Sequence, residues 1–112
     1  MEFNNNTCKF TLKGHTNGVF GLKQITPSIL ASGSYDRTIK LWDITSGQLI
    51  RTLTGHTNSI GWSIDLLNSQ TLVSGSYDQT IKLWNWSTGE CLSTIQTNST
   101  LTFYSIAVID IN

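Results

Sequence analysis

The sequence has few charged residues and no net charge. Seven basic and seven acidic side chains balance among 112 residues, and charged residues make up 12% of the chain. A protein that binds nucleic acid or an anionic membrane through its surface potential carries an excess of basic side chains. Because this chain has no such excess, we expect neither nucleic acid nor a membrane among its partners.

The sequence also lacks long apolar runs. No stretch approaches the ~20 apolar residues of a transmembrane helix. Residues 1–10 contain no basic segment followed by an apolar run, as a secretory signal peptide would. We therefore expect a soluble cytoplasmic protein, with the nucleus as the alternative compartment.

Motifs for metal, phosphate or nucleotide binding are missing. The two histidines lie 41 residues apart and the two cysteines 83 apart, and neither spacing is typical of a metal site. Neither of the glycine-rich patterns that bind phosphate groups occurs. We expect no metal and no cofactor.

Internal repetition is what the sequence does have. The residues SGSYDRTIKLWD, from Ser32 to Asp43, return 42 residues later as SGSYDQTIKLWN, from Ser74 to Asn85. The tetrapeptide Gly-His-Thr-Asn that begins at Gly14 returns 41 residues later at Gly55. A period of this length indicates a repeat architecture. Short, evenly spaced strands with no helical periodicity predict an all-β fold.

A Gly-His pair, a strand followed by Asp and a strand ending in Trp-Asp together resemble the WD40 repeat, the blade of a β-propeller. The resemblance covers about residues 8–95 in two copies. It implies an incomplete WD40-type propeller of about two four-stranded antiparallel blades plus flanking strands. Propellers close with at least about four blades, so this chain holds two full blades and part of a third.

The repeat divides the chain into five segments. Residues 1–7 are polar and predicted to be disordered. Residues 8–12 are predicted to be the outer strand of a preceding blade. Repeat 1 covers 13–53 and repeat 2 covers 54–95, and 96–112 begin a partial third repeat with an inner strand at 103–109.

Each repeat is predicted to form four strands. The expected ranges are 19–24, 29–34, 38–44 and 48–53 in repeat 1, then 60–66, 71–76, 81–86 and 90–95 in repeat 2. A loop one residue longer after the strand 60–66 is expected to explain the two repeat spacings. Cys8, Leu49 and Cys91 share one position of the repeat, which predicts an apolar packing site and inert, unpaired thiols. Trp62 and Trp86 are not shared by both repeats and are expected to pack between blades.

Each repeat also contains histidine, serine, aspartate and tryptophan, which could suggest a Ser-His-Asp catalytic arrangement. The resemblance implies a structural network instead, in which Asp orients His, His meets a strand Ser and Ser reaches the Trp indole N–H. The constellation occurs twice at the repeat period, and a catalytic site is normally needed once. Two serines of each strand face the same side, so either could take part. The network residues are His15, Ser32 or Ser34, Asp36 and Trp42, then His56, Ser74 or Ser76, Asp78 and Trp84.

The resemblance also indicates where a partner would bind. In WD40 repeats, contacts come from the residue before the turn Asp and from those three and five positions after the Gly-His histidine. Here these positions are Tyr35, Tyr77, Gly18, Phe20, Ser59 and Gly61. Aromatic side chains are common binding anchors. The competing interpretation is that the tyrosines recur because the repeats are copies and that Phe20 packs on a neighbouring loop.

The sequence therefore predicts a non-catalytic scaffold that binds a protein or peptide on its loop rim. The alternative is an accessory propeller of a larger signalling or enzymatic protein whose catalytic domain is not in this chain. Two blades leave apolar end faces and strand edges uncovered. Three explanations compete: further blades in a longer chain, closure with copies of this chain, or an arc that is stable alone.

Overall fold

The computed structural model describes residues 8 and 10–100, apart from the side chain of Trp62. It contains eight β-strands. These are β1 (Val19–Thr26), β2 (Ile29–Ser34), β3 (Ile39–Asp43), β4 (Gln48–Leu53), β5 (Ile60–Asn68), β6 (Thr71–Ser76), β7 (Thr80–Asn85) and β8 (Glu90–Gln96). The predictions for 1–7, for the inner strand 103–109 and for the packing of Trp62 lie outside the described residues.

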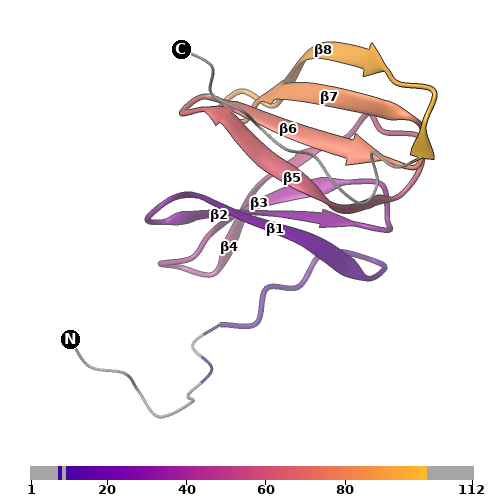
Figure 1. The fold of residues 1–112 in the computed structure, drawn as a ribbon. Helices are drawn as coiled ribbons and strands as arrows, with labels where there is room; N and C mark the ends of the chain where they lie inside the picture. Colours follow the sequence, from indigo (N-terminus) through magenta and orange to yellow (C-terminus); the bar gives the residue numbers. More distant parts are fainter. Residues whose placement is uncertain (1–7, 9, 101–112) are drawn as a thin grey trace.

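The strands form two four-stranded antiparallel sheets, in the orders β1-β2-β3-β4 and β5-β6-β7-β8. The two sheets are stacked face to face, and β5 lies against β1 and β2 (Figure 1). Every strand in each sheet is joined to the next by a short connection, as in a meander. The predicted all-β fold of antiparallel four-stranded blades is confirmed.

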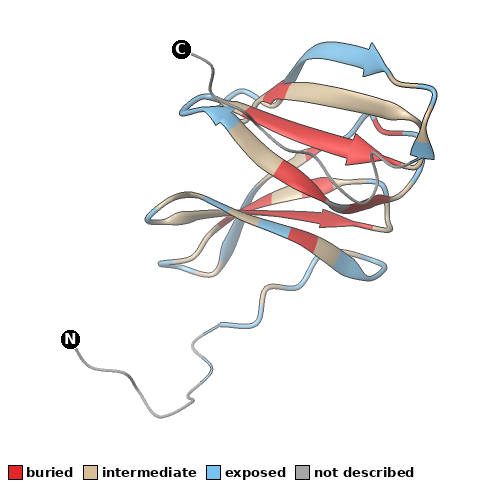
Figure 2. Cartoon of the chain, viewed as in Figure 1, coloured by how far each residue is buried: buried red, intermediate tan, exposed pale blue. Residues whose placement is uncertain are grey.

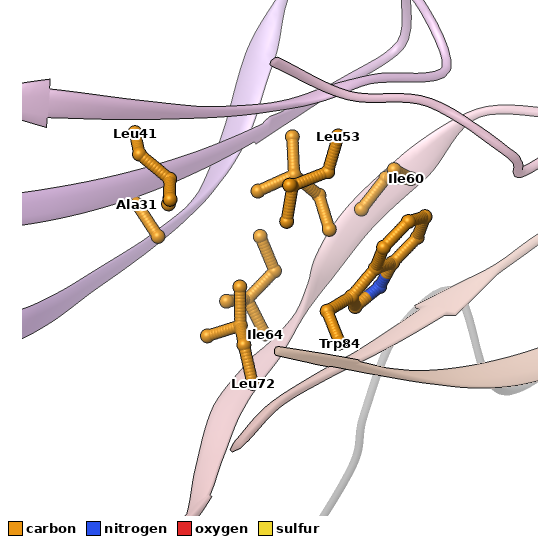
Figure 3. Close-up of a cluster of buried hydrophobic side chains, with 8 residues drawn as sticks. Ala31, Leu41, Leu53, Ile60, Ile64, Leu72 and Trp84 are labelled. Atoms are coloured by element: carbon orange, nitrogen blue, oxygen red, sulfur yellow. The ribbon is translucent and has the colours of Figure 1, made fainter. Parts of the chain in front are cut away.

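The hydrophobic core lies between the two sheets. Ala31, Leu41 and Leu53 of the first sheet face Ile64 and Leu72 of the second (Figure 3). Ile39, Ile60 and Trp84 complete this buried cluster, and Trp86 packs against it while half-buried. Strands β2 and β6 are the most buried, whereas every residue of β8 is exposed (Figure 2).

Two glycines let the sheets approach each other. A Cβ added to Gly33 would lie 2.4 Å from Ile64 Cδ1 and 2.8 Å from Ile60 Cγ2. A Cβ added to Gly21 would lie 2.5 Å from the carbonyl oxygen of Gly61. The close contact of β5 with β1 and β2 therefore depends on the absence of side chains at Gly21 and Gly33.

The extra residue of the second repeat lies inside a strand, not in a loop as the sequence predicted. Both inner hairpins close over two residues, at 27–28 and 69–70. The register instead shifts between Ile60 and Ile64 of β5, which pair with Ser76 and Ser74. A β-bulge accommodates an extra residue in one strand of a pair, and this one lies where Gly61 meets Gly21.

Residues 8 and 10–12 form no strand, which corrects the prediction of an outer strand there. A strand needs a neighbour for its backbone hydrogen bonds, and none of the eight described strands pairs with this segment. Its local geometry still resembles β8, because Cys8 Sγ lies 3.4 Å from the carbonyl of Phe10, and Cys91 Sγ lies 3.6 Å from that of Ser93.

The predicted apolar packing site at the cysteine position is wrong. Cys8 and Cys91 are free thiols on the surface, and Leu49 is exposed as well. Leu49 and Cys91 lie on β4 and β8, the outer edge strands of the two sheets. Side chains on an outer strand have fewer neighbours to cover them than those on inner strands.

Candidate functional site

The first sheet holds a hydrogen-bonded chain from a carboxylate to an indole. His15 Nδ1 lies 2.7 Å from Asp36 Oδ2, and His15 Nε2 lies 2.7 Å from Ser32 Oγ. Trp42 Nε1–H donates to Ser32 Oγ at 2.8 Å. The four residues come from the Gly-His loop, β2, the β2–β3 turn and β3, so the chain of bonds joins the loop to the sheet.

The second sheet repeats this arrangement. His56 Nδ1 lies 2.7 Å from Asp78 Oδ2, His56 Nε2 lies 2.7 Å from Ser74 Oγ, and Trp84 Nε1–H donates to Ser74 Oγ at 2.8 Å. The residue before His56 is a glycine because the Trp84 ring packs closely there: a Cβ added to Gly55 would lie 3.1 Å from that ring.

The two serines of each strand have separate roles, which the sequence left open. Ser32 and Ser74 join the histidine and the tryptophan. Ser34 Oγ donates to the carbonyl of Gly18 at 2.8 Å and accepts the backbone N–H of Asp36. Ser76 makes the matching bond to the carbonyl of Ser59 at 2.9 Å. The second serine therefore fastens the end of the Gly-His loop to the β-turn.

Each aspartate accepts four hydrogen bonds. Asp78 receives them from His56 Nδ1, Thr57 N, Thr80 N and Thr80 Oγ1, and Asp36 from the equivalent groups of His15, Thr16 and Thr38. Burial works to raise the pKa of Asp36, but the bonds from Thr38, His15 and Thr16 outweigh it and lower the pKa to about 2. Burial also works to raise the pKa of Asp78, but the hydrogen bonds from Thr80 and His56 outweigh burial and lower this pKa.

Burial favours the neutral form of the His56 imidazole. Burial lowers its pKa below the usual 6.5, against the opposing effect of Asp78. A carboxylate can only accept, so Nδ1 carries the proton and Nε2 accepts the hydroxyl hydrogen of Ser74. Every polar atom of the chain from Asp78 to Trp84 is then satisfied without a buried positive charge.

This geometry does not suit nucleophilic catalysis. Ser32 and Ser74 are buried, with exposed fractions of 3% and 0%. Each serine oxygen also accepts an indole N–H, which uses one of its two lone pairs. Satisfied buried polar groups contribute to stability and to a single defined arrangement. The constellation is suited to holding the loops in place.

Above the network, five of the six predicted partner-contact residues lie together. The rings of Phe20 and Tyr35 have centroids 4.4 Å apart and are tilted by 38°. Gly18 lies under the Phe20 ring, where a Cβ would be 2.9 Å from its edge, and accepts the N–H of Tyr35. Ser59 Oγ donates to the carbonyl of Tyr35 at 3.0 Å, and its own carbonyl accepts the N–H of Tyr77. Ser59 therefore connects the rims of the two sheets.

Gly61, the sixth predicted contact, does not reach this rim. It is buried, and its carbonyl oxygen faces Gly21 in the contact between β1 and β5. The bulge in β5 adds a residue after Ile60, so counting positions from the histidine no longer gives the same place in both repeats. We therefore correct this assignment: Gly61 belongs to the packing between the sheets.

The structure adds residues that the sequence analysis did not single out. Thr38 and Thr80 donate to their aspartates from both backbone and side chain. Arg37 and Gln79 occupy the left-handed region of the backbone, with φ of 77° and 69°. Asn17 and Asn58 accept the N–H of the next residue. Their recurrence at the repeat period was the available signal.

No group of three or more His, Cys, Asp or Glu side chains in the described part of the chain could hold a metal ion. The described residues also contain no helix long and apolar enough to cross a membrane.

A model of the WD domain, G-beta repeat, matches residues 6–43 and 47–85. The chain belongs to the WD40 repeat family. The family resemblance in the sequence is thus confirmed, and its two matched segments each contain one histidine network. WD40 repeats serve as protein-interaction scaffolds and are generally not catalytic.

Relatives with similar WD40 segments include fungal proteins. One is named as a probable E3 ubiquitin ligase complex SCF subunit, sconB, of Talaromyces marneffei, with 62% identity over 42 residues, 38% of this chain and 6% of the relative. The sconB protein of Arthroderma benhamiae is 60% identical over 47 residues, 41% of this chain and 7% of the relative. The chain thus matches less than a tenth of the length of these relatives.

Proposed function

We propose that this chain is a non-catalytic scaffold that binds a protein or peptide at a rim patch formed by Gly18, Phe20, Tyr35, Ser59 and Tyr77. The observation that supports this most directly is the Phe20–Tyr35 ring contact, at the edge of the first sheet and bonded to the second through Ser59. Aromatic side chains bring a large contact area at a low cost in conformational entropy. The hydrogen-bonded loops beneath hold these rings in place before a partner arrives.

The test is a comparison of proteins captured by the wild-type chain and by two variants. Tyr35→Ala removes a rim ring, whereas Leu92→Ala removes an apolar side chain, 49% exposed, from β8, the outer edge strand of the second sheet. We expect Tyr35→Ala to lose partners that Leu92→Ala retains, with circular dichroism showing that both variants are folded. Equal capture by the three proteins would contradict a binding role for the rim.

A second candidate is the accessory propeller portion of a larger enzymatic or signalling protein whose catalytic domain is not in this chain. The relatives named as subunits of an SCF ubiquitin ligase complex favour it. In this case the rim would position a protein for chemistry carried out elsewhere. A polypeptide that joins these repeats to a kinase, nucleotide-binding or ligase-type domain would support this candidate, and its absence from every transcript that contains the repeats would refute it.

A further inference from the structure

The contact between the two sheets shows how one sheet of this chain covers another. Leu53 of β4 lies on the side of the first sheet that faces the second, and Ile64 of β5 lies on the side of the second sheet that faces the first (Figure 3). Both side chains are buried in this internal contact, with exposed fractions of 1% and 7%. They mark its two sides, the covering face and the covered face.

The equivalent residues on the outer faces of the two sheets are exposed. Ile95 is the equivalent of Leu53, because Ile95 pairs with Ile81 as Leu53 pairs with Ile39. Leu22 is the equivalent of Ile64, as their pairing with Ser32 and Ser74 shows. Ile95 is 47% exposed and Leu22 is 63% exposed. The second sheet therefore has an uncovered covering face, and the first sheet has an uncovered face of the kind that is covered.

The side chains on these two faces match those of the internal contact. A cavity of about 120 Å³ lies on the first sheet, and its apolar lining consists of Leu12, Val19, Leu22, Leu30 and Trp42. The equivalent set is buried in the internal contact: Leu53, Ile60, Ile64, Leu72 and Trp84. Three residues of the first sheet complete that buried cluster, namely Ala31, Ile39 and Leu41. Their equivalents in the second sheet are also apolar: Val73, Ile81 and Leu83.

Charge complementarity favours the same combination of faces. Lys23 Nζ of β1 lies 3.0 Å from Asp65 Oδ1 of β5 across the internal contact. The two residues occupy equivalent positions, since Lys23 pairs with Ala31 and Asp65 pairs with Val73. When the second sheet of another copy covers the first sheet, its Asp65 comes beside Lys23. A lysine then meets an aspartate at every contact between sheets, within each chain and between chains.

We infer that the exposed face of the first sheet binds the second sheet of another copy of this chain, head to tail, in the geometry of the internal contact. Such a pair leaves one free face at each end, so copies add until the assembly closes into a ring. Propellers have about four to eight blades, which corresponds to roughly two to four copies. The faces involved do not include the residues of the rim patch, so this inference does not depend on the proposed function.

Residues 10–12 lie where β8 of the second copy would dock. A Cβ added to Gly47 would lie 2.7 Å from Phe10 Cδ1, and one added to Gly89 would lie 2.9 Å from Arg51 Cδ. Phe10 therefore lies on the first sheet as Arg51 of β4 lies on the second. The segment 10–12 pairs with none of the eight described strands, whereas β8 pairs with β7 from Glu90 to Gln96. Docking thus exchanges an unpaired segment for a paired strand.

The experiment measures mass by light scattering for two variants, alone and mixed. Leu22→Asp disrupts the covered face and Ile95→Asp the covering face. We expect the wild-type chain to reach a limiting mass of roughly two to four chains, and each variant alone to stay at 12.4 kDa. An equimolar mixture should form a pair that stops at twice this mass, because each variant retains the face that the other lacks.

Leu92→Asp is the matched control on β8. Leu92 is 49% exposed, and its equivalent Ile50 stays 45% exposed beside the internal contact, so docking should leave Leu92 uncovered. This variant should associate as the wild type does. Circular dichroism checks that the variants are folded, and Ile95→Ser repeats the test with a smaller polar side chain.

Phe10→Ala should act in the opposite direction to Leu22→Asp. It loosens the segment that β8 replaces, so half-association should occur at a concentration about threefold to tenfold lower. A wild-type chain that stays monomeric would overturn the inference and would mean that something other than a second copy covers the face. A mixture of Leu22→Asp and Ile95→Asp that stays monomeric, or equal loss of association in Leu92→Asp and Ile95→Asp, would also overturn it.

Discussion

At the scale of single residues, Asp36 and Asp78 have a larger role than orienting a histidine. Each carboxylate accepts the backbone N–H of the residue after the histidine. It also accepts the backbone N–H and the hydroxyl of the threonine that lies two residues after the aspartate itself. One side chain therefore fixes both the Gly-His loop and the turn between the second and third strands. The pattern of Asp followed by x-Thr is visible in the sequence, but its fourfold bonding is seen only in the structure.

Asp78→Ala should lower the free energy of unfolding by about 1–3 kcal/mol, because buried partners lose their acceptor. The measurement is the urea midpoint. Asp65→Ala is the control, since Asp65 forms a partly exposed ion pair with Lys23 at 3.0 Å and such pairs contribute about 1 kcal/mol or less. Equal shifts for the two variants would show that the Asp78 network adds nothing beyond a surface ion pair.

Stability should also fall as the pH is lowered, in two windows. The lowered pKa of His56 means that the unfolded chain takes up a proton first as the pH falls below ~6.5, so stability present above that value declines. The lowered pKa of Asp36, about 2, acts between about pH 4 and pH 2, where its carboxylate becomes protonated in the unfolded chain first. The lowered pKa of Asp78 acts in the same direction as the pH falls below about 4. Urea midpoints that stay level from about pH 7 to about pH 3 would contradict both effects.

At the scale of strands and sheets, the contact of β5 with β1 and β2 depends on Gly21 of β1 and Gly33 of β2. Gly33→Ala should destabilise the chain by about 1–3 kcal/mol, because the new methyl group would overlap Ile64 Cδ1. Ile64→Val removes this atom, so the double variant should recover part of the loss. The measurement is again the urea midpoint of each single variant and of the pair. Strict additivity would show that the two side chains do not meet.

The strands of both repeats could be predicted from the sequence, because period-2 patterning and the repeat locate them independently. The absence of a strand at 8–12 could not be predicted, because a strand also needs a neighbouring strand to pair with, and the local residue pattern does not show whether one is present. The sequence analysis placed the extra residue of the second repeat in the loop after the strand 60–66, but it lies in the bulge at 61–63. The repeat spacing shows that a residue has been added and does not show where. This error placed Gly61 at the rim. The roles of Ser32 and Ser34 likewise depend on three-dimensional contacts, although both serines were correctly placed on one strand.

At the scale of the whole molecule, equivalent faces of the two sheets differ in what covers them. Ile60 and Ile64 of β5 are 0% and 7% exposed under the first sheet, whereas Val19 and Leu22 of β1 are 45% and 63% exposed. The two pairs are equivalent, because Ile60 and Ile64 pair with Ser76 and Ser74. In the first sheet Val19 and Leu22 pair with the matching serines, Ser34 and Ser32. The first sheet therefore presents an apolar face of the kind that another blade covers.

This face should cause the chain to associate at high concentration. By light scattering, we expect an apparent mass that rises above the 12.4 kDa of one chain, because buried apolar area drives association. Leu22→Asp should keep the mass near that of the monomer without unfolding the sheets. A wild-type chain that stays monomeric at every concentration would show that the face needs no cover.

The central claim is that the two networks make the rim a fixed platform for a partner, and backbone hydrogen exchange tests it most directly. The amides of Thr57 and Tyr77 lie in a loop and a turn, yet they bond to Asp78 and to the carbonyl of Ser59. We predict that both exchange as slowly as strand amides, and that Asp78→Ala releases them while Thr16 and Tyr35 of the first sheet stay protected. Free exchange of Thr57 and Tyr77 in the wild-type chain would contradict the claim.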